Sequence, residues 1–149
     1  MMASATPLLE VQNLAITLQT QRGAVRAVHD LGFTLARGET VGLIGESGCG
    51  KSLTALALMG LLPDGASVRG SIRFDGQEVL AMPDKTLCQL RGNRMAMVFQ
   101  EPMSALNPVH SIGRQVAEPL RLHQGLSARQ ARTQAMELLE RVGIARAAE

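Results

Sequence analysis

Aromatic side chains are nearly missing from this sequence, which has three phenylalanines, no tyrosine and no tryptophan. A hydrophobic core must therefore be aliphatic, with the eight methionines filling gaps. Because aromatics to stack bases are scarce and the net charge is only +2, nucleic acid is not an expected partner. The solvated face of an amphipathic helix, rather than a basic stripe that binds nucleic acid, is the expected setting of Arg129, Arg132 and Arg141.

Long apolar runs and disulfide patterns are also absent. No stretch of roughly 18 apolar residues predicts a transmembrane helix, and the first seven residues do not resemble a signal peptide. Cys49 and Cys88 do not form a disulfide framework, which favours a reducing compartment. The histidines at 29, 110 and 123 have no metal-ligand partner at useful spacing, so we expect them to be solvated.

The most informative motif lies at residues 45–52 and matches the Walker A pattern G-x-x-x-x-G-K-[ST]. Its members are Gly45, Glu46, Ser47, Gly48, Cys49, Gly50, Lys51 and Ser52. Glycines allow the backbone to curl around phosphates, Lys51 supplies a cation for the β- and γ-phosphates, and Ser52 supplies a hydroxyl for Mg²⁺. We expect a short buried strand before the loop, over 39–44, and a helix after it, ended by Gly60. The alternative is a glycine turn that feeds a core helix with an exposed lysine.

The flanking segments predict strands first and helices later. Apolar and polar residues alternate in parts of 8–18, and short strands are expected at 24–28, 31–35 and 68–74, the last followed by an Asp-Gly turn. The nearly continuous apolar run 95–99, which ends before Gln100, predicts a buried parallel strand.

Helices are expected at 84–90 and from Ser111 onward. Ser127 with Gln130 predicts a capping box, and Gly143 ends the helix that follows. The apolar stripe expected on this helix consists of Ala131, Ala135, Leu138, Leu139 and Val142.

Together, the phosphate loop, the apolar strand ending in Gln100 and the helical region resemble the ATP-binding subunits of ABC transporters. The amino-acid sequences of residues 45–52 and 98–108 are similar to those of the dipeptide and oligopeptide importer subgroup. Related subunits in that group also serve nickel and glutathione. The resemblance implies an α/β fold: a P-loop NTPase core (about 39–62 and 94–100), an antiparallel β arm (about 8–38 and 64–80) and the start of a helical subdomain (about 103–149).

The resemblance also implies roles for residues and partners. Residues 45–52 would bind ATP, Ser52 and Gln100 would contact Mg²⁺, and Gln100 would position the attacking water; alternatively, Gln100 only caps a strand. The segment from Glu101 to Glu118 would dock membrane permease subunits. A second ATP-binding subunit would complete a head-to-tail dimer, and a periplasmic or surface solute-binding protein would act indirectly. The expected location is peripheral, on the cytoplasmic face of the bacterial inner membrane.

Two features depart from the family. Leu18 stands where members often carry an aromatic residue that stacks on adenine. The 149 residues contain no Leu-Ser-Gly-Gly-Gln signature and no apolar run ending in Asp-Glu, the Walker B strand with its catalytic glutamate. We therefore expect the truncated, N-terminal part of an importer ATPase. The alternatives are a non-catalytic nucleotide-binding fragment and a soluble ABC-type ATPase.

Overall fold

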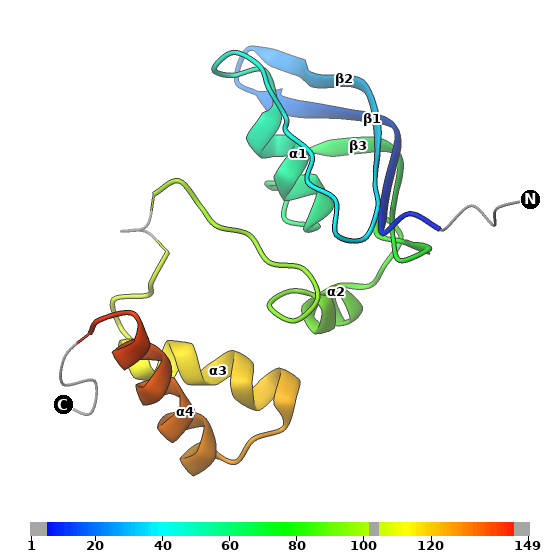
Figure 1. The fold of residues 1–149 in the computed structure, drawn as a ribbon. Helices are drawn as coiled ribbons and strands as arrows, with labels where there is room; N and C mark the ends of the chain where they lie inside the picture. The colour runs from blue at the N-terminus through cyan, green and yellow to red at the C-terminus, as the bar shows by residue number, and fades with distance from the viewer. Residues whose placement is uncertain (1–5, 102–104, 145–149) are drawn as a thin grey trace, which may run out of the picture. The chain divides into compact units, whose positions relative to one another are not determined.

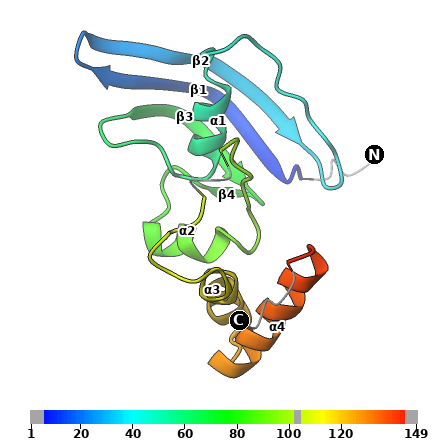
Figure 2. The same cartoon turned by 90° about the vertical axis from the view of Figure 1, so that its left-hand side faces the viewer.

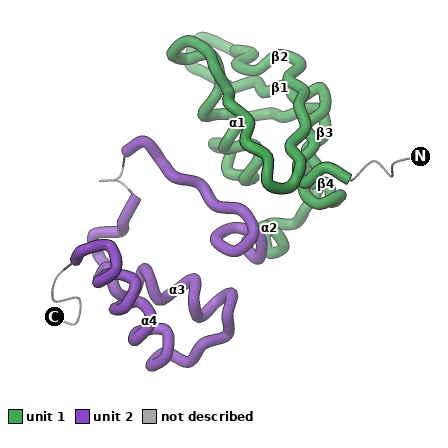
Figure 3. The backbone as a smooth tube through the Cα atoms, in the orientation of Figure 1, with its two compact units in different colours: residues 1–87 green, residues 88–149 purple. Residues whose placement is uncertain are grey.

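The computed structural model describes residues 6–101 and 105–144. The chain divides into two compact units, Met1–Leu87 and Cys88–Glu149, which are coloured separately in Figure 3. The first unit contains every strand assigned in the described residues and the helix that follows the Walker A motif. The second contains a pair of longer helices.

The first unit is built on a four-stranded antiparallel sheet with the order β2-β1-β3-β4. Its strands are β1 (Leu9–Thr20), β2 (Gly23–Leu35), β3 (Ser67–Phe74) and β4 (Gln77–Glu78), shown in Figures 1 and 2. The expected strands at 8–18 and 68–74 are confirmed as β1 and β3. The two short strands expected at 24–28 and 31–35 are wrong as separate elements, because β2 runs through both.

The continuous β2 strand is made possible by bulges. Asn13 on β1 and Asp30 on β2 adopt positive φ angles of 50° and 47°. The Asn13 side-chain amide donates a hydrogen bond to the Asp30 carboxylate at 2.8 Å. Short polar side chains tolerate this left-handed conformation, so the chain can take up the irregularity without ending the strand.

The core of the first unit is aliphatic, as the composition predicts. The largest fully buried side chains are Leu14, Ile16, Ile72, Val11 and Val79. Helix α1 (Lys51–Leu58) lies against one face of the sheet in both views (Figures 1 and 2) and contributes the fully buried Ala57. The helix begins at Lys51, two residues before the apolar run that predicted it, and Gly60 follows it with a φ of 63°.

The Glu78 carboxylate links β4 to β3 at the edge of the sheet. Glu78 accepts hydrogen bonds from the Ser71 hydroxyl, the Ile72 amide at 3.0 Å and the Leu80 amide at 3.3 Å. Burial raises the pKa of the Glu78 carboxyl, but these hydrogen bonds and the charge of Arg73 outweigh it. The net pKa is below the ordinary value of 4.5.

Replacing Glu78 with glutamine is therefore expected to lower the free energy of unfolding by about 1 kcal/mol at pH 7. A carboxyl with a lowered folded pKa stabilises the protein above its unfolded pKa, and this contribution is lost as pH falls through the folded pKa. The difference between the two proteins should therefore shrink below about pH 4.5. Urea unfolding followed by far-UV circular dichroism measures it, with Glu137→Gln, at an exposed position on the helix Ala128–Arg141, as the control. Equal stability at pH 7 would contradict this role.

The second unit contains the helix pair α3 (Ile112–Gln124) and α4 (Ala128–Arg141), and α2 (Asp84–Leu90) crosses from the first unit into it. Ser111 caps α3, and the predicted capping box between Ser127 and Gln130 is confirmed. The core between α3 and α4 consists of Ala117, Leu120, Ala131 and Ala135, with Val116, Leu126 and Leu138 packed against it. Val142 is 74% exposed, so its place in the expected stripe is wrong.

Two expected strands do not form in this chain. Residues 39–44 have no strand assignment, and Ile44 is 97% exposed. Residues 95–99 make one isolated parallel bridge, between Arg91 and Met95, and Val98 is 96% exposed. A strand needs a neighbour for its backbone hydrogen bonds, and among the described residues no strand pairs with either segment. None of the helices in the described ranges combines the length and apolar character needed to cross a membrane.

Candidate functional site

The Walker A residues form a tight turn that leads directly into α1. Gly48 and Gly50 adopt positive φ angles of 81° and 95°, and Gly50 is the N-cap of the helix. The Gly50 carbonyl accepts hydrogen bonds from the Thr54 amide at 2.8 Å and the Thr54 hydroxyl at 3.0 Å. The first amides of a helix have no intrahelical acceptors, so those of Lys51 and Ser52 are available to a ligand at this end.

Two of the glycines have close neighbours, and at Gly50 the neighbour is backbone. A Cβ atom on Gly50 would lie 2.7 Å from the Ala27 carbonyl oxygen and 2.8 Å from a methyl carbon of Val28. A Cβ atom on Gly45 would lie 2.5 Å from the Cys49 sulfur. At Gly50 the backbone therefore lies closer to its neighbours than a side chain would permit. At Gly48, by contrast, nothing lies within 4 Å of the Cβ position. Such a cradle of backbone groups fits a phosphate.

Lys51 places a positive charge inside this curl. Its Nζ atom donates hydrogen bonds to the carbonyl oxygens of Gly45 and Glu46, both at 2.7 Å, and lies 3.5 Å from the Cys49 sulfur. The ammonium group thus bridges the start of the loop and the start of α1. Together with the helix N-terminus, it makes this end of the first unit suited to bind an anion.

The predicted metal ligands lie in different units. Ser52 is exposed in the first turn of α1. Gln100 is exposed in the second unit, after the segment that does not form a strand, and its role with Mg²⁺ and water stays a prediction. Within residues 6–101 and 105–144, no group of three or more His, Cys, Asp or Glu side chains is placed to hold a metal.

Sequence reasoning missed the wall that faces the loop. An open pocket of about 300 Å³ lies between β2 and the loop, and its lining includes Ala27, Val28 and His29 with Lys51 and Thr54. The β2 residues are about 20 positions before the loop in the sequence, and no local spacing signals that they line the same pocket. A larger cavity, about 650 Å³, lies on α3 and α4 in the second unit and includes no Walker A residue.

Comparison with known sequences identifies the family of this chain. The profile of the ABC transporter family matches residues 28–149. A Brucella abortus protein provisionally named a peptide import ATP-binding protein is 52% identical over 143 residues, covering 95% of this chain and 43% of the relative. The oligopeptide transport ATP-binding protein OppD of Salmonella typhimurium is 47% identical over 138 residues, covering 93% of this chain and 41% of the relative. The chain spans less than half the length of these relatives.

Solved structures show the same fold. The ATP-binding cassette MJ0796, in a dimer bound to ADP and Pi, matches with a TM-score of 0.71 at 24% identity. The match covers 89% of this chain and 56% of that one. This confirms the expected fold class, an α/β ATP-binding cassette with an antiparallel sheet. Because the family profile matches far more than half of its residues, this chain belongs to the ABC transporter family.

Proposed function

We propose that this chain binds MgATP at residues 45–52 as part of the energy-coupling subunit of an ABC importer for peptides or similar small solutes. The observation that carries the proposal is the tight glycine curl with the Lys51 ammonium inside it, at the start of α1. The relatives named for ATP binding in peptide import and oligopeptide transport support the nucleotide and the solute class.

Each residue of the loop has a distinct role in this proposal. The amides at the start of α1 bind phosphate oxygens, and Lys51 exchanges its carbonyl acceptors for the β- and γ-phosphates. The Ser52 hydroxyl contacts Mg²⁺, which when bound neutralises phosphate charge. Gln100 contributes a side-chain amide for Mg²⁺ and for positioning water. These roles make residues 45–52 the binding element and assign Gln100 to the hydrolytic step.

The proposed partners are a second ATP-binding subunit and membrane permease subunits. The solved cassette MJ0796 is a dimer, which supports the first. For the second, the segment Glu101–Glu118, of which 102–104 lie outside the described residues, exposes Val109 and Ile112, and Ile112 lines the cavity on α3 and α4. Exposed apolar side chains of this kind mark protein interfaces. The subunit would then sit peripherally at the cytoplasmic face of the membrane, with a solute-binding protein acting through the permease.

Gln115 holds part of this docking segment in place. Its side-chain amide donates to the carbonyls of Asn107 and His110, both at 2.9 Å, and its oxygen accepts from the Asn107 amide at 2.8 Å. The turn before α3 is thereby fixed to the helix. A partner would meet a surface that is ordered before binding, which lowers the entropic cost of docking.

Calorimetric titration of MgATP into the monodisperse 149-residue protein tests the proposed binding. A saturable one-site isotherm would support the phosphate loop as a nucleotide site, and the absence of binding by correctly folded protein would overturn it. The alternative, a nucleotide-binding chain without hydrolysis, predicts the same isotherm, and turnover separates the two. The similarity to peptide import proteins argues against a soluble ABC-type ATPase.

Cys49 provides an independent readout of the same site. Its exposed sulfur lies 3.5 Å from the Lys51 ammonium, inside the loop that the nucleotide would cover. Saturating MgATP is expected to slow alkylation of Cys49 by about tenfold or more. The reason is that only the small fraction of loops without bound nucleotide would still react. The exposed thiol of Cys88 serves as the internal control and should react at an unchanged rate. Mass spectrometry of both peptides measures the effect; equal protection at the two sites, or none, counts against the loop as the nucleotide site.

A further inference from the structure

The start of α1 differs from the starts of the two longer helices. At α3 and α4 the hydroxyls of Ser111 and Ser127 accept hydrogen bonds from amides of the first turn. Gly50, the N-cap of α1, has no side chain that could do so. A capping oxygen would compete with a phosphate oxygen for the same N–H groups. The first turn of α1 therefore keeps its donors for a ligand, but it lacks the bond that commonly fixes the beginning of a helix.

Thr54 fixes this helix start through a carbonyl instead. Its hydroxyl donates a hydrogen bond to the Gly50 carbonyl oxygen at 3.0 Å, and its amide donates to the same oxygen at 2.8 Å. A peptide unit is planar and trans, so a carbonyl that is held in place also sets the direction of the next N–H, which belongs to Lys51. The two bonds thereby aim the Lys51 amide out of the helix, toward the end where a phosphate would lie.

The burial of Thr54 indicates a role for its hydroxyl. The side chain is 3% exposed, and it is the one polar side chain among the buried residues that the structure describes. Valine has a similar shape and would fill the position without a polar atom that needs a partner. Because a buried hydroxyl costs free energy unless it is hydrogen-bonded, the bond to Gly50 is the feature that distinguishes threonine from valine here.

We propose that Thr54 is a positioning residue for phosphate binding: its hydroxyl holds the Gly50–Lys51 peptide so that the Lys51 amide already faces the ligand site before a ligand arrives. The inference rests on the proposed nucleotide-binding role of residues 45–52. Gly50 also lies against β2, since a Cβ atom there would be 2.7 Å from the Ala27 carbonyl oxygen. Contacts with β2 and with Thr54 together restrict this peptide, and such preorganisation lowers the entropic cost of binding.

Thr54→Val removes the hydroxyl and keeps a similar shape. We expect it to weaken the binding of MgATP and of magnesium tripolyphosphate alike, by about 2- to 10-fold, which corresponds to one hydrogen bond. The two ligands share the phosphates, which are the part that the Lys51 amide would contact. Thr54→Ser restores a hydroxyl and should bind both ligands within about twofold of the unmodified protein. If Thr54→Val does not fold, Thr54→Ala, a better helix former, takes its place.

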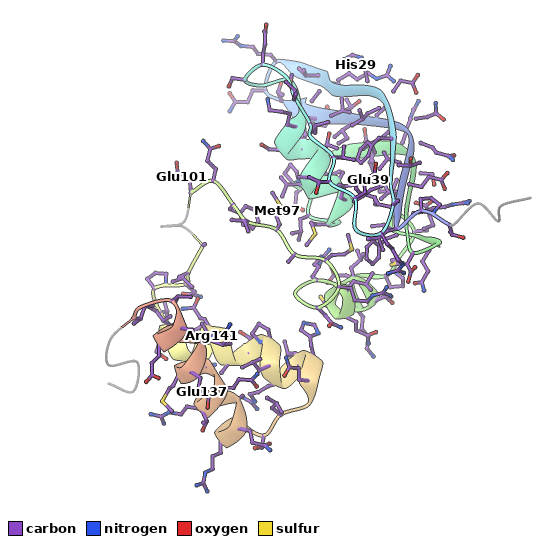
Figure 4. All side chains as sticks on the ribbon, in the orientation of Figure 1. His29, Glu39, Met97, Glu101, Glu137 and Arg141 are labelled. Carbon is purple, nitrogen blue, oxygen red and sulfur yellow. The ribbon has the colours of Figure 1, made fainter. Side chains whose placement is uncertain are left out.

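Thr133→Val is the matched control. The Thr133 hydroxyl donates to the Arg129 carbonyl oxygen at 3.2 Å, which is the same bond to the residue four positions earlier in a helix. Thr133 lies on α4, about one turn before Glu137, which Figure 4 labels on that helix. It belongs to the second unit, which contains no Walker A residue, so both affinities should stay unchanged. Calorimetry measures the affinities, and thermal melts by circular dichroism check the folding of each variant.

A readout at the amide itself separates positioning from a general loss of stability. In nitrogen–proton correlation NMR spectra, saturating tripolyphosphate should shift the Lys51 amide resonance of the unmodified protein. In Thr54→Val this shift should be smaller even at saturation, because the amide is no longer aimed at the phosphates. A threonine that only stabilised α1 would leave the shift unchanged in folded, saturated protein.

The outcomes distinguish this inference from the proposed function. Weaker binding of both ligands by folded Thr54→Val, with recovery in Thr54→Ser and a smaller Lys51 shift, supports it. Unchanged affinities in folded Thr54→Val overturn it and leave the phosphate loop intact. Weakening for MgATP alone, or an equal loss in Thr54→Ser, also overturns it, because neither would come from the hydroxyl acting on the phosphate end. If the unmodified protein bound neither ligand, the proposed function itself would fail.

Discussion

MgATP affinity is expected to fall by about 100-fold or more when Lys51 is replaced by alanine. The Lys51 ammonium group lies within 2.7 Å of two loop carbonyls and can be transferred to phosphate oxygens with little movement. Hydrogen bonds to charged groups contribute about 1.5–3 kcal/mol each, and each 1.4 kcal/mol is a factor of about ten. Two such bonds to the β- and γ-phosphates account for the expected loss, and the amides of the loop remain as the weaker binding element.

Calorimetry on the unmodified protein and on Lys51→Ala measures this effect. The chain offers a matched control in Lys85→Ala, since Lys85 is the other lysine of the sequence and lies exposed on α2. The control should keep full affinity. Because Lys51 also ties the loop together, thermal melts must show that the variant folds as the unmodified protein does. Equal MgATP affinities of the folded Lys51→Ala and unmodified proteins would contradict the assignment of the phosphate loop.

The elements that sequence could predict are those fixed by local interactions. The capping box at Ser127 is formed by a side chain and an amide three residues apart, so its spacing in the sequence is sufficient to find it. The same holds for α2, which has the bounds that its acidic cap and spacing indicate. The hairpin β1–β2 is closed by a turn in which the Thr20 hydroxyl donates to the Gly23 carbonyl.

The elements that sequence reasoning assigned wrongly depend on distant partners. The apolar runs at 39–44 and 95–99 have the composition of buried strands, yet no strand of the described residues pairs with them. Composition indicates which segments can be strands, but only pairing makes them so. The break expected within β2 failed for a related reason, because Asn13 on the neighbouring strand stabilises the bulge at Asp30. Such a contact spans 17 residues and has no local signal.

The candidate site also has one part that the sequence could predict and one part that it could not. The loop could be predicted because its function needs particular residue types at fixed spacing. The structure explains Gly50 by close contacts, and both Gly48 and Gly50 by positive φ angles. The facing wall, with Val28 and His29, could not be predicted, because any strand could have supplied it. Gln100 was found through the resemblance alone, and its role stays a prediction.

The 149-residue protein is expected to bind ATP without turning it over. Hydrolysis of the γ-phosphate needs a group that positions water and further charge that stabilises the transition state. Residues 1–149 contain no apolar run ending in Asp-Glu and no Leu-Ser-Gly-Gly-Gln, the segments that the family resemblance assigns to these tasks. In the proposed roles, the loop amides, Lys51 and Ser52 hold the substrate. Binding that is equal in the ground state and the transition state does not accelerate the chemical step.

The same protein is also expected to be poorly soluble. Ile44 and Val98 are 97% and 96% exposed, and each belongs to an apolar run without a paired strand. Unpaired apolar segments of this kind associate with one another between molecules. Replacing Ile44 with lysine should raise the monomeric fraction in size-exclusion chromatography, and the Lys51 contacts, which involve Gly45 and Glu46 backbone, would be kept.

Phosphate release by monodisperse protein decides the turnover prediction. The rate with MgATP should not exceed that of Lys51→Ala at the same concentration, even where calorimetry shows the unmodified protein saturated with nucleotide. This combination separates a binding element from a catalytic one, because contaminating ATPases would raise both proteins equally. Steady MgATP-dependent release that is absent from Lys51→Ala would show that the loop, with groups from residues 1–149 alone, suffices for catalysis. Gln100→Ala would then be the next variant to measure, since Gln100 is the water-positioning residue proposed within these residues.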